Sequence, residues 1–196
     1  MILLPVSRSS IPASAMLFLV LTGVAPAQQA ESNKTYGVAT LKLGSIRNSS
    51  ATYAGGRGGW VLDGNYGIGI GGYWLLNNLK ARVPDTSGDS RMMVSYGGLD
   101  LEYLVPLDSS FRISAQALVG GGAVGYTEGR YTNPRPHYDP FVVFEPGVNV
   151  EADLTRVFRF VVSGSYRLVG RLSSRIATNS DIAGPTFGVS IKAGFF

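Results

Sequence analysis

The charged residues that could do chemistry in this sequence fall at alternate positions, opposite the apolar face of the segments that hold them. The bases are Lys42, Arg57, Arg112, Arg159 and Arg167, and the acids are Asp100, Glu102, Glu145, Glu151 and Asp153. Side chains of these types can form structural ion pairs, line a gated ion path or supply buried catalytic carboxylates. A buried charge without a partner is costly in free energy. We therefore expect paired networks that fix the register of neighbouring strands.

Two of these pairs follow from one register of the segments on either side of Thr155. If the chain folds back so that Asp153 faces Arg159, then Glu145 faces Arg167. Opposite charges that face each other across two strands attract, so a single register creates two favourable pairs. The other residues for which we expect structural ion pairs in the interior are Glu102, Arg112 and Arg57.

The elements that position these charges are strands, because apolar residues recur at every second position. In the last segment Phe187, Val189, Ile191, Ala193 and Phe195 alternate with small or polar residues, up to the final Phe196. We expect eight strands, over residues 35–45, 52–62, 66–77, 91–104, 111–126, 140–154, 157–172 and 184–196. A tilted strand needs about 9–11 residues to cross a membrane, and most of these segments are that long or longer.

The connections between these segments alternate between short and long. Short turns are expected at Asp63, Pro106 and Thr155, and longer connections around Ser49, Pro84, Pro134 and Asn179. In outer-membrane barrels the short turns face the periplasm and the long loops face the outside. With an even number of strands, both ends of the barrel domain then lie on the periplasmic side.

The first 27 residues have the features of a cleavable export signal. Arg8 supplies the positive charge, Met16–Val24 the apolar core and Ala25–Ala27 the small-x-small cleavage site. The apolar core is too short to span a bilayer as a helix, although an N-terminal anchor helix is the alternative. We expect residues 28–196 to form one exported barrel domain.

Composition supports a membrane barrel and excludes several kinds of site. The chain has 26 glycines and only 15% charged residues, where soluble domains carry about 25%. The absence of cysteine excludes disulfides, thiolate catalysis and cysteine-based metal sites. The net charge of +4 comes from bases scattered singly, a pattern that does not favour nucleic acid as a partner.

Gly67–Gly72 matches the G-x-G-x-x-G pattern of dinucleotide-binding turns. That pattern binds a dinucleotide only where a strand leads into a helix, and here it lies inside an alternating segment. We interpret the inward-facing glycines as clearing space for bulky partners such as Arg57 and Tyr53.

Aromatic residues lie on the apolar face near the ends of the segments. They are Trp60, Tyr66, Trp74, Tyr103, Phe111, Phe158 and Phe195. This distribution is typical of the interfacial girdles of membrane barrels. A platform that stacks sugars or other ligands is the functional alternative.

Over its whole mature length the chain resembles the small eight-stranded outer-membrane β-barrels, the group that includes the OmpX-like proteins and the transmembrane domain of OmpA. The resemblance rests on the final strand ending at Phe196, on Gly55–Trp60 and on Gly98–Tyr103. It implies an all-β fold: an eight-stranded antiparallel up-and-down transmembrane β-barrel. It also implies a place in the bacterial outer membrane and recognition of the Phe196 strand by the barrel-assembly machinery.

The resemblance indicates a class of function and leaves the specific role open. We expect a non-enzymatic monomer with a structural or surface-contact role through residues 78–90, 127–139 and 173–183. Outer-membrane lipid and lipopolysaccharide would be its partners, with no cofactor, no metal and no nucleic acid. A small pore is one alternative, and a soluble lipocalin-like barrel with an apolar inside is another.

Some small barrels modify lipid A with a histidine and a serine near the outer rim, so an outer-leaflet lipid-modifying enzyme is a further alternative. His137 is the only histidine, in a proline-rich segment expected to be external, and Asp139 is close to it in sequence. A loop histidine without a recognisable serine and acid pattern is usually a polar loop residue. We therefore assign no catalytic residue.

Overall fold

The computed structural model describes residues 34–80, 90–108, 110–128, 137–174 and 177–194. The chain separates into two units, Met1–Ser32 and Asn33–Phe196, and the described residues belong to the second. Its elements are β1 (Lys34–Ile46), β2 (Ser49–Leu62), β3 (Tyr66–Leu75), β4 (Leu79–Lys80), β5 (Ser90–Pro106), β6 (Phe111–Glu128), β7 (His137–Asp153), β8 (Phe158–Gly170), α1 (Asn179–Ile182) and β9 (Gly184–Gly194). The expected export signal, residues 1–27, lies outside the described residues.

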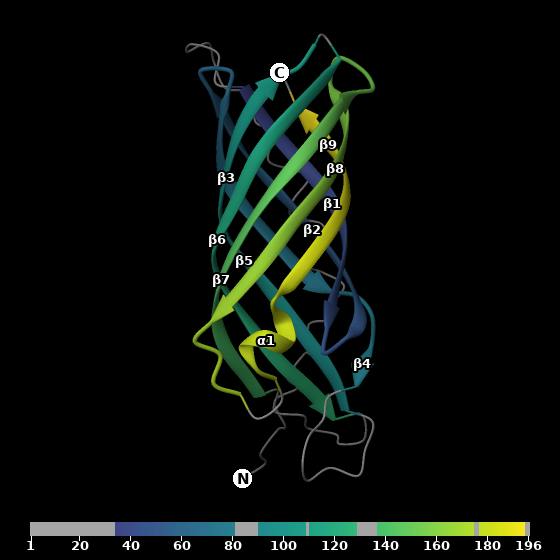
Figure 1. Cartoon of the computed structure of the whole chain (residues 1–196), viewed down its shortest axis with the longest axis vertical. Coiled ribbons are helices and arrows are strands. Elements are labelled where there is room, and N and C mark those ends of the chain that lie inside the picture. The colour runs from purple at the N-terminus through teal and green to yellow at the C-terminus, as the bar shows by residue number, and fades with distance from the viewer. Residues whose placement is uncertain (1–33, 81–89, 109, 129–136, 175–176, 195–196) are drawn as a thin grey trace, which may run out of the picture. The chain divides into compact units, whose positions relative to one another are not determined.

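Antiparallel pairing joins these strands into a closed ring (Figure 1). β1 pairs with β2 on one side and with β9 on the other. From β9 the order runs through β8, β7 and β6 to β5, and β5 pairs with β3 to complete the ring. The two-residue β4 adds a short extension beside β5. The described residues thus form an up-and-down barrel of eight long strands, as the alternating pattern predicts.

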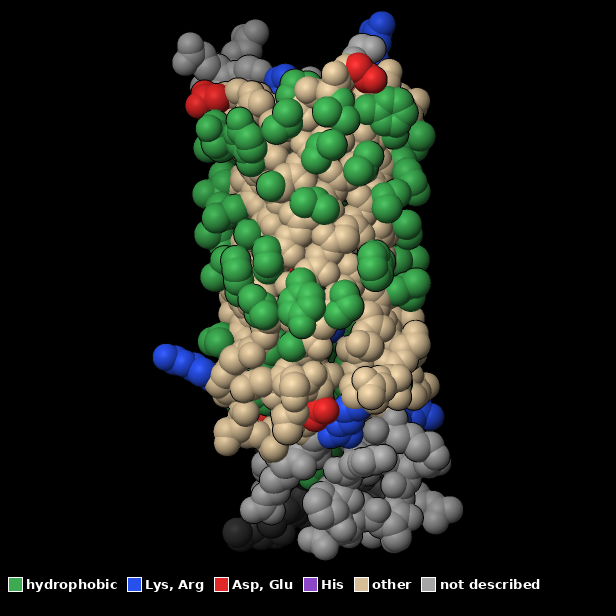
Figure 2. Space-filling view, in the orientation of Figure 1, with side chains coloured by type: hydrophobic (Ala, Val, Ile, Leu, Met, Phe, Trp, Pro, Cys, Tyr) green, Lys and Arg blue, Asp and Glu red, His purple; other side chains and the backbone are tan. Residues whose placement is uncertain are grey.

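The outer wall of the barrel is apolar. Figure 2 shows hydrophobic side chains spread over the visible wall, with charged side chains gathered at its two ends. Ile70 on β3 is 73% exposed and Phe187 on β9 is 67% exposed, and they belong to a large set of exposed apolar side chains. Such a surface is stable against lipid, where closure also pairs the backbone N–H and C=O groups.

Aromatic side chains encircle the short-turn end of this wall. Trp60, Tyr66, Tyr103, Phe111 and Phe158 are all exposed near that end of their strands. Tyr66 and Tyr103 face each other across β3 and β5, with ring centroids 5.1 Å apart. Trp74 is exposed near the opposite end of β3, and Phe195 lies outside the described residues. The arrangement is that of interfacial girdles.

The turns match the expected asymmetry with one exception. Asp63 and Gly64 form the predicted tight turn, both with positive φ, and the Asn65 amide donates to the Leu62 carbonyl at 3.2 Å. The longer connection expected around Ser49 is wrong, because a two-residue turn, Arg47–Asn48, joins β1 to β2 with φ values of 49° and 61°. Arginine is unusual at a turn position with positive φ, and this turn lacks the Asn-Gly or Asp-Gly pair by which such turns are usually recognised.

The loop expected over residues 127–139 is shorter than predicted, and the connection around Asn179 is not purely irregular. β6 continues to Glu128 and β7 already begins at His137. The segment before β9 contains α1, where Asp181 accepts a hydrogen bond from the Thr178 amide at 2.8 Å. Short helices in polar loops carry little periodic signal in the sequence, and this one was not predicted.

A charge on the outer wall tests the lipid contact directly. Ile70→Arg places a cation mid-strand on the lipid-facing side, and we expect it to lower the free energy of unfolding by about 2–4 kcal/mol. Leu62→Arg, at the girdle end of the same wall, should cost only about 0–1 kcal/mol. Denaturant unfolding in lipid vesicles measures both values. Equal costs for the two variants would contradict the membrane-embedded arrangement.

Candidate functional site in the barrel interior

A chain of buried ion pairs crosses the lumen in its short-turn half. Arg57 on β2 donates to Asp100 at 3.0 Å and to Glu102 at 3.4 Å, both on β5. Lys192 on β9 lies 3.0 Å from Glu102 and 2.7 Å from Glu151 on β7. All five side chains are buried. They come from four strands, so the network ties opposite walls of the barrel together.

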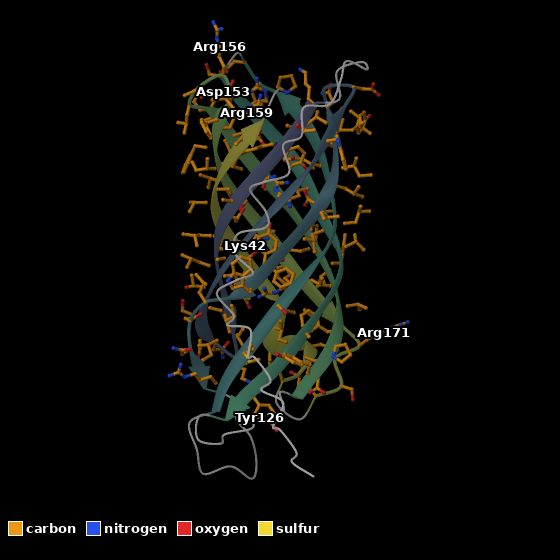
Figure 3. All side chains as sticks on the ribbon, turned by 180° about the vertical axis from the view of Figure 1, so that it is seen from behind. Lys42, Tyr126, Asp153, Arg156, Arg159 and Arg171 are labelled. Carbon is orange, nitrogen blue, oxygen red and sulfur yellow. The ribbon has the colours of Figure 1, made fainter. Side chains whose placement is uncertain are left out.

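This series of ion pairs continues to the short-turn end of the lumen. Arg159 on β8 lies 3.4 Å from Glu151 and donates through Nε to Asp153 at 2.7 Å. The same Asp153 oxygen accepts a second bond from Arg112 at 2.7 Å. Figure 3 shows Asp153 and Arg159 together at this end. Asp153 and Arg159 are directly opposite in the β7–β8 register, as the sequence predicts.

Uncharged polar groups complete the coordination of these carboxylates. Ser114 donates to Glu102 at 2.6 Å, and Gln116 donates to Asp100 at 2.6 Å. The Asn149 amide lies within hydrogen-bonding distance of Glu102, Ser114 and Gln116, at 2.9–3.2 Å. A buried ion pair is stable only when its remaining lone pairs are also satisfied. This network meets that condition, and it fixes the positions of its members.

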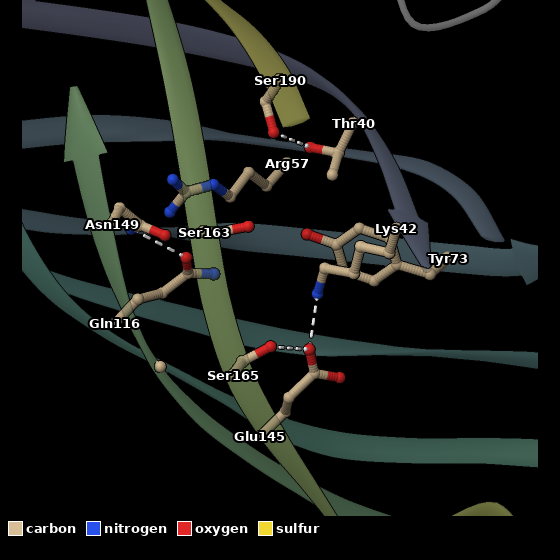
Figure 4. A pocket seen from close by; sticks show the side chains of 11 residues that line it. Thr40, Lys42, Arg57, Tyr73, Gln116, Glu145, Asn149, Ser163, Ser165 and Ser190 are labelled. Atoms are coloured by element: carbon tan, nitrogen blue, oxygen red, sulfur yellow. Dashed lines mark hydrogen bonds and ion pairs between the residues drawn. The ribbon is translucent and has the colours of Figure 1, made fainter. Parts of the chain in front are cut away.

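A separate pair occupies the middle of the lumen (Figure 4). The Lys42 ammonium on β1 lies 2.6 Å from Glu145 on β7 and 3.7 Å from the centre of the Tyr73 ring. The bonded Glu145 oxygen also accepts from Ser165 at 2.7 Å and from Thr186 at 3.2 Å. These residues adjoin a polar internal cavity of about 10 Å³, close to the smallest space that holds one water molecule.

The predicted pair between Glu145 and Arg167 does not form. The β7–β8 register is the expected one, with Phe144 opposite Leu168, but the ladder is interrupted at Glu145 and Pro146. Glu145 binds Lys42 from β1, and Arg167 donates through Nε to the Ile182 carbonyl of α1 at 2.9 Å. The prediction considered only neighbouring strands, whereas side chains in a narrow lumen reach across it.

The sequence analysis did not include Lys192 among the charged residues expected in the interior. The alternating pattern does place it there, because Gly188, Ser190 and Lys192 share the non-apolar face of the last strand. Gly71 has the predicted role: a Cβ there would lie 3.1 Å from the Cβ of Arg57. Glycine there leaves space for the Arg57 side chain.

The loop-side half of the lumen is filled by apolar and aromatic side chains. Tyr96 lies between Tyr53 and Tyr73, with ring centroids 5.9 Å and 5.4 Å away, and these rings border the polar half. Beyond them pack Ile46, Met92, Val94, Val124, Phe141 and Val143, together with Ala177 and Ile182 from the segment around α1. The lumen therefore has a charged layer and an apolar layer.

Contacts with β1 and β8 hold α1 over this apolar layer. The Arg47 amide donates to the Asp181 carbonyl at 3.1 Å, and the Arg47 guanidinium lies 3.6 Å from the Asp181 carboxylate. Burial favours the neutral carboxyl, but the hydrogen bonds from Thr178 and the nearby Arg47 outweigh it and hold the pKa of Asp181 below its usual value. Asp181 is therefore ionised at neutral pH and stabilises α1.

The last candidates from the sequence are the single histidine and possible metal ligands. His137 is the first residue of β7, paired with Tyr126 in the ladder, so its backbone lies in a strand and not in a loop. No group of three or more potential metal ligands occurs among the described residues. Within the same residues, no helix has the length and apolar character needed to cross a membrane.

Removing one buried cation tests the energetic weight of the network. Lys192→Met leaves Glu102 and Glu151 without the ammonium between them, and we expect a loss of about 3–5 kcal/mol in the free energy of unfolding. The control, Arg156→Met, removes an exposed cation and should change it by less than about 0.5 kcal/mol. Adding Glu151→Gln to Lys192→Met should restore part of the loss. A similar small effect of both single variants would show that the network is not stabilising.

Comparisons with known proteins agree with this architecture. Neither a scan against protein-family models nor a search of curated proteins finds a match. Among solved structures, Neisserial surface protein A superposes with a TM-score of 0.62 at 9% identity, over 83% of this chain and 96% of that one. The N-terminal β-barrel domain of Pseudomonas aeruginosa OprF gives 0.52 at 12% identity, over 84% of this chain and 98% of that domain.

At these identities the similarity concerns the fold alone. The closed ring and the apolar, girdled wall independently indicate a barrel surrounded by lipid. The chain has the fold of the small eight-stranded β-barrels of the bacterial outer membrane.

Proposed function

We propose that this chain is a non-enzymatic outer-membrane barrel that acts as a membrane-anchored structural or contact element and does not transport solutes. The observation that carries the proposal is the occupied lumen. Ion pairs linked across four strands fill one half, and packed aromatic and apolar side chains fill the other. A barrel of eight strands is only wide enough to be filled by side chains, so function is left to the outside of the molecule.

The loop-side end is the part of the barrel available for contact. β5, β6 and β7 are 17, 18 and 17 residues long, well beyond the roughly 9–11 residues that cross a bilayer. Short turns join β5 to β6 and β7 to β8 at the girdle end, so the extra length lies at the opposite end. These three strands therefore extend past the lipid and present a β-structured surface to the outside.

The partner that fits this end best is the phosphate-bearing layer of lipopolysaccharide. Arg91, at the start of β5, and Arg171, directly after β8, are exposed at the loop-side end, and Figure 3 shows Arg171 there. Guanidinium groups bind phosphate well because their N–H donors are arranged as a rigid fork. The lipid-modifying alternative depends on His137, whose backbone begins β7.

Conductance across a planar bilayer tests the closed lumen. The wild-type protein should show no large steady current, because the ion pairs and the tyrosine layer occupy the described lumen. The double variant Tyr73→Ala/Tyr96→Ala removes two rings from that layer and should raise the current while the heat-modifiable band of the folded barrel is retained. A large steady current from the wild-type protein would favour the pore alternative.

Binding to lipopolysaccharide vesicles tests the contact surface. Arg91→Gln/Arg171→Gln should weaken binding of the barrel's loop-side end by about ten-fold, since two charge-assisted contacts are lost. Arg156→Gln removes an exposed arginine from the short-turn end and serves as the matched control. The proposal requires the two variants to differ, and equal binding would exclude a phosphate contact at the loop-side arginines.

A further inference from the structure

Arg167 differs from every other buried cation in the lumen. Its side chain is fully buried on β8, and its guanidinium lies over the rings of Tyr53 and Tyr96, at 4.6 Å and 5.1 Å from their centres. Only Nε has a hydrogen-bond partner among the described residues, the Ile182 carbonyl. Both terminal nitrogens, NH1 and NH2, have none. Stacking on tyrosine stabilises the positive charge but leaves these N–H donors unused.

The neighbouring polar atoms increase the excess of donors. The hydroxyl groups of Tyr53 and Tyr96 are also buried without a hydrogen-bond partner in the described structure, as is the Oε2 atom of Glu145. Two nitrogens with two hydrogens each and two hydroxyls can donate, whereas Glu145 Oε2 is the one atom of this group that only accepts. A guest that satisfies the cluster must therefore supply acceptors.

Charge leads to the same conclusion. The buried charged side chains of the described lumen are five cations, Lys42, Arg57, Arg159, Arg167 and Lys192, and four carboxylates, Asp100, Glu102, Glu145 and Glu151. Each cation except Arg167 lies within 4.0 Å of a carboxylate. The excess is one positive charge, and it resides on Arg167. A single negative charge would balance it, and an uncompensated buried charge is costly.

From donors, charge and position we infer that Arg167, Tyr53 and Tyr96 form a binding site for a monovalent anion. The site lies beneath α1, whose Ile182 carbonyl holds Nε and so orients the guanidinium. Gly44 on β1 borders the site, where a Cβ would lie 3.8 Å from NH2 but only 3.0 Å from the Thr186 Cγ2 atom, so the space there suits a small guest. The guest is a free anion such as formate or chloride, or the carboxylate head group of an acid whose apolar tail displaces part of the adjoining apolar layer.

The experiment uses the folded barrel in lipid nanodiscs and two nuclear magnetic resonance reporters. One is the Nε–Hε signal of Arg167, assigned by its loss in Arg167→Lys, and the other is the backbone amide of Ile182. Formate, chloride and octanoate are titrated separately at constant ionic strength, with the bulky gluconate anion as the balancing salt. We expect a saturable shift of both reporters, while the Nε–Hε signal of Arg57, which is held by two carboxylates, stays unchanged.

Variants tie the shift to the site. Tyr53→Phe keeps the ring and loses the hydroxyl, so it should weaken binding about ten-fold or more, the usual effect of losing a hydrogen bond to a charge. Arg167→Met should abolish the shift of the Ile182 amide. Arg156→Met removes an exposed guanidinium from the short-turn end and should leave the titration unchanged. If Arg167→Met does not give a heat-modifiable folded barrel, Tyr53→Phe decides.

The three titrations distinguish the sources of the anion. Saturation by formate and chloride at concentrations similar to octanoate supports a free-ion site. Saturation by octanoate at ten-fold lower concentration than formate supports a site for the head group of an amphiphile. Absence of a saturable shift with all three anions, or shifts that are equal in wild type and Tyr53→Phe, would overturn the inference.

Discussion

Backbone hydrogen bonding between β1 and β9 joins the first and last strands of the barrel, and the other properties of the molecule depend on that closure. Lipid offers no partners to unpaired N–H and C=O groups, so an open edge would be unstable in a membrane. Closure with eight strands sets a narrow diameter, and the narrow diameter brings side chains from opposite walls into contact. Lys42 on β1 can therefore reach Glu145 on β7, although these strands are not neighbours.

The ion pairs and the strand register reinforce each other. A shift of one residue between β7 and β8 would turn either Asp153 or Arg159 toward the lipid, and a shift of two would separate them by a full pleat. The pairs thus penalise wrong registers more strongly than they favour folding in absolute terms, because desolvation offsets much of their attraction. The hydroxyl and amide groups of Ser114, Gln116 and Asn149 matter for the same reason, since they satisfy oxygens that would otherwise oppose burial.

The alternation of apolar and polar residues was sufficient to predict the barrel and its short-turn end, because one face of each strand contacts lipid and the other faces the lumen. It also predicted which side Asp153 and Arg159 share. It could not predict the partner of Glu145, since contacts across the lumen depend on the tilt and stagger of distant strands. The turn at Arg47–Asn48 was not predicted because it lacks the Asn-Gly or Asp-Gly pair that usually marks a turn with positive φ. The helix α1 was not predicted because four residues are too few to show a helical pattern of apolar residues.

The unequal lengths of the described strands give the barrel wall a stepped edge at the loop-side end. β1 and β2 meet in a two-residue turn, while β5, β6 and β7 continue farther at the same end (Figure 1). The barrel wall is therefore shorter on the side of β1 and β2 than on the side of β5, β6 and β7. On the taller side, the described strands offer a lateral surface to a neighbour that lies alongside the barrel in the membrane plane.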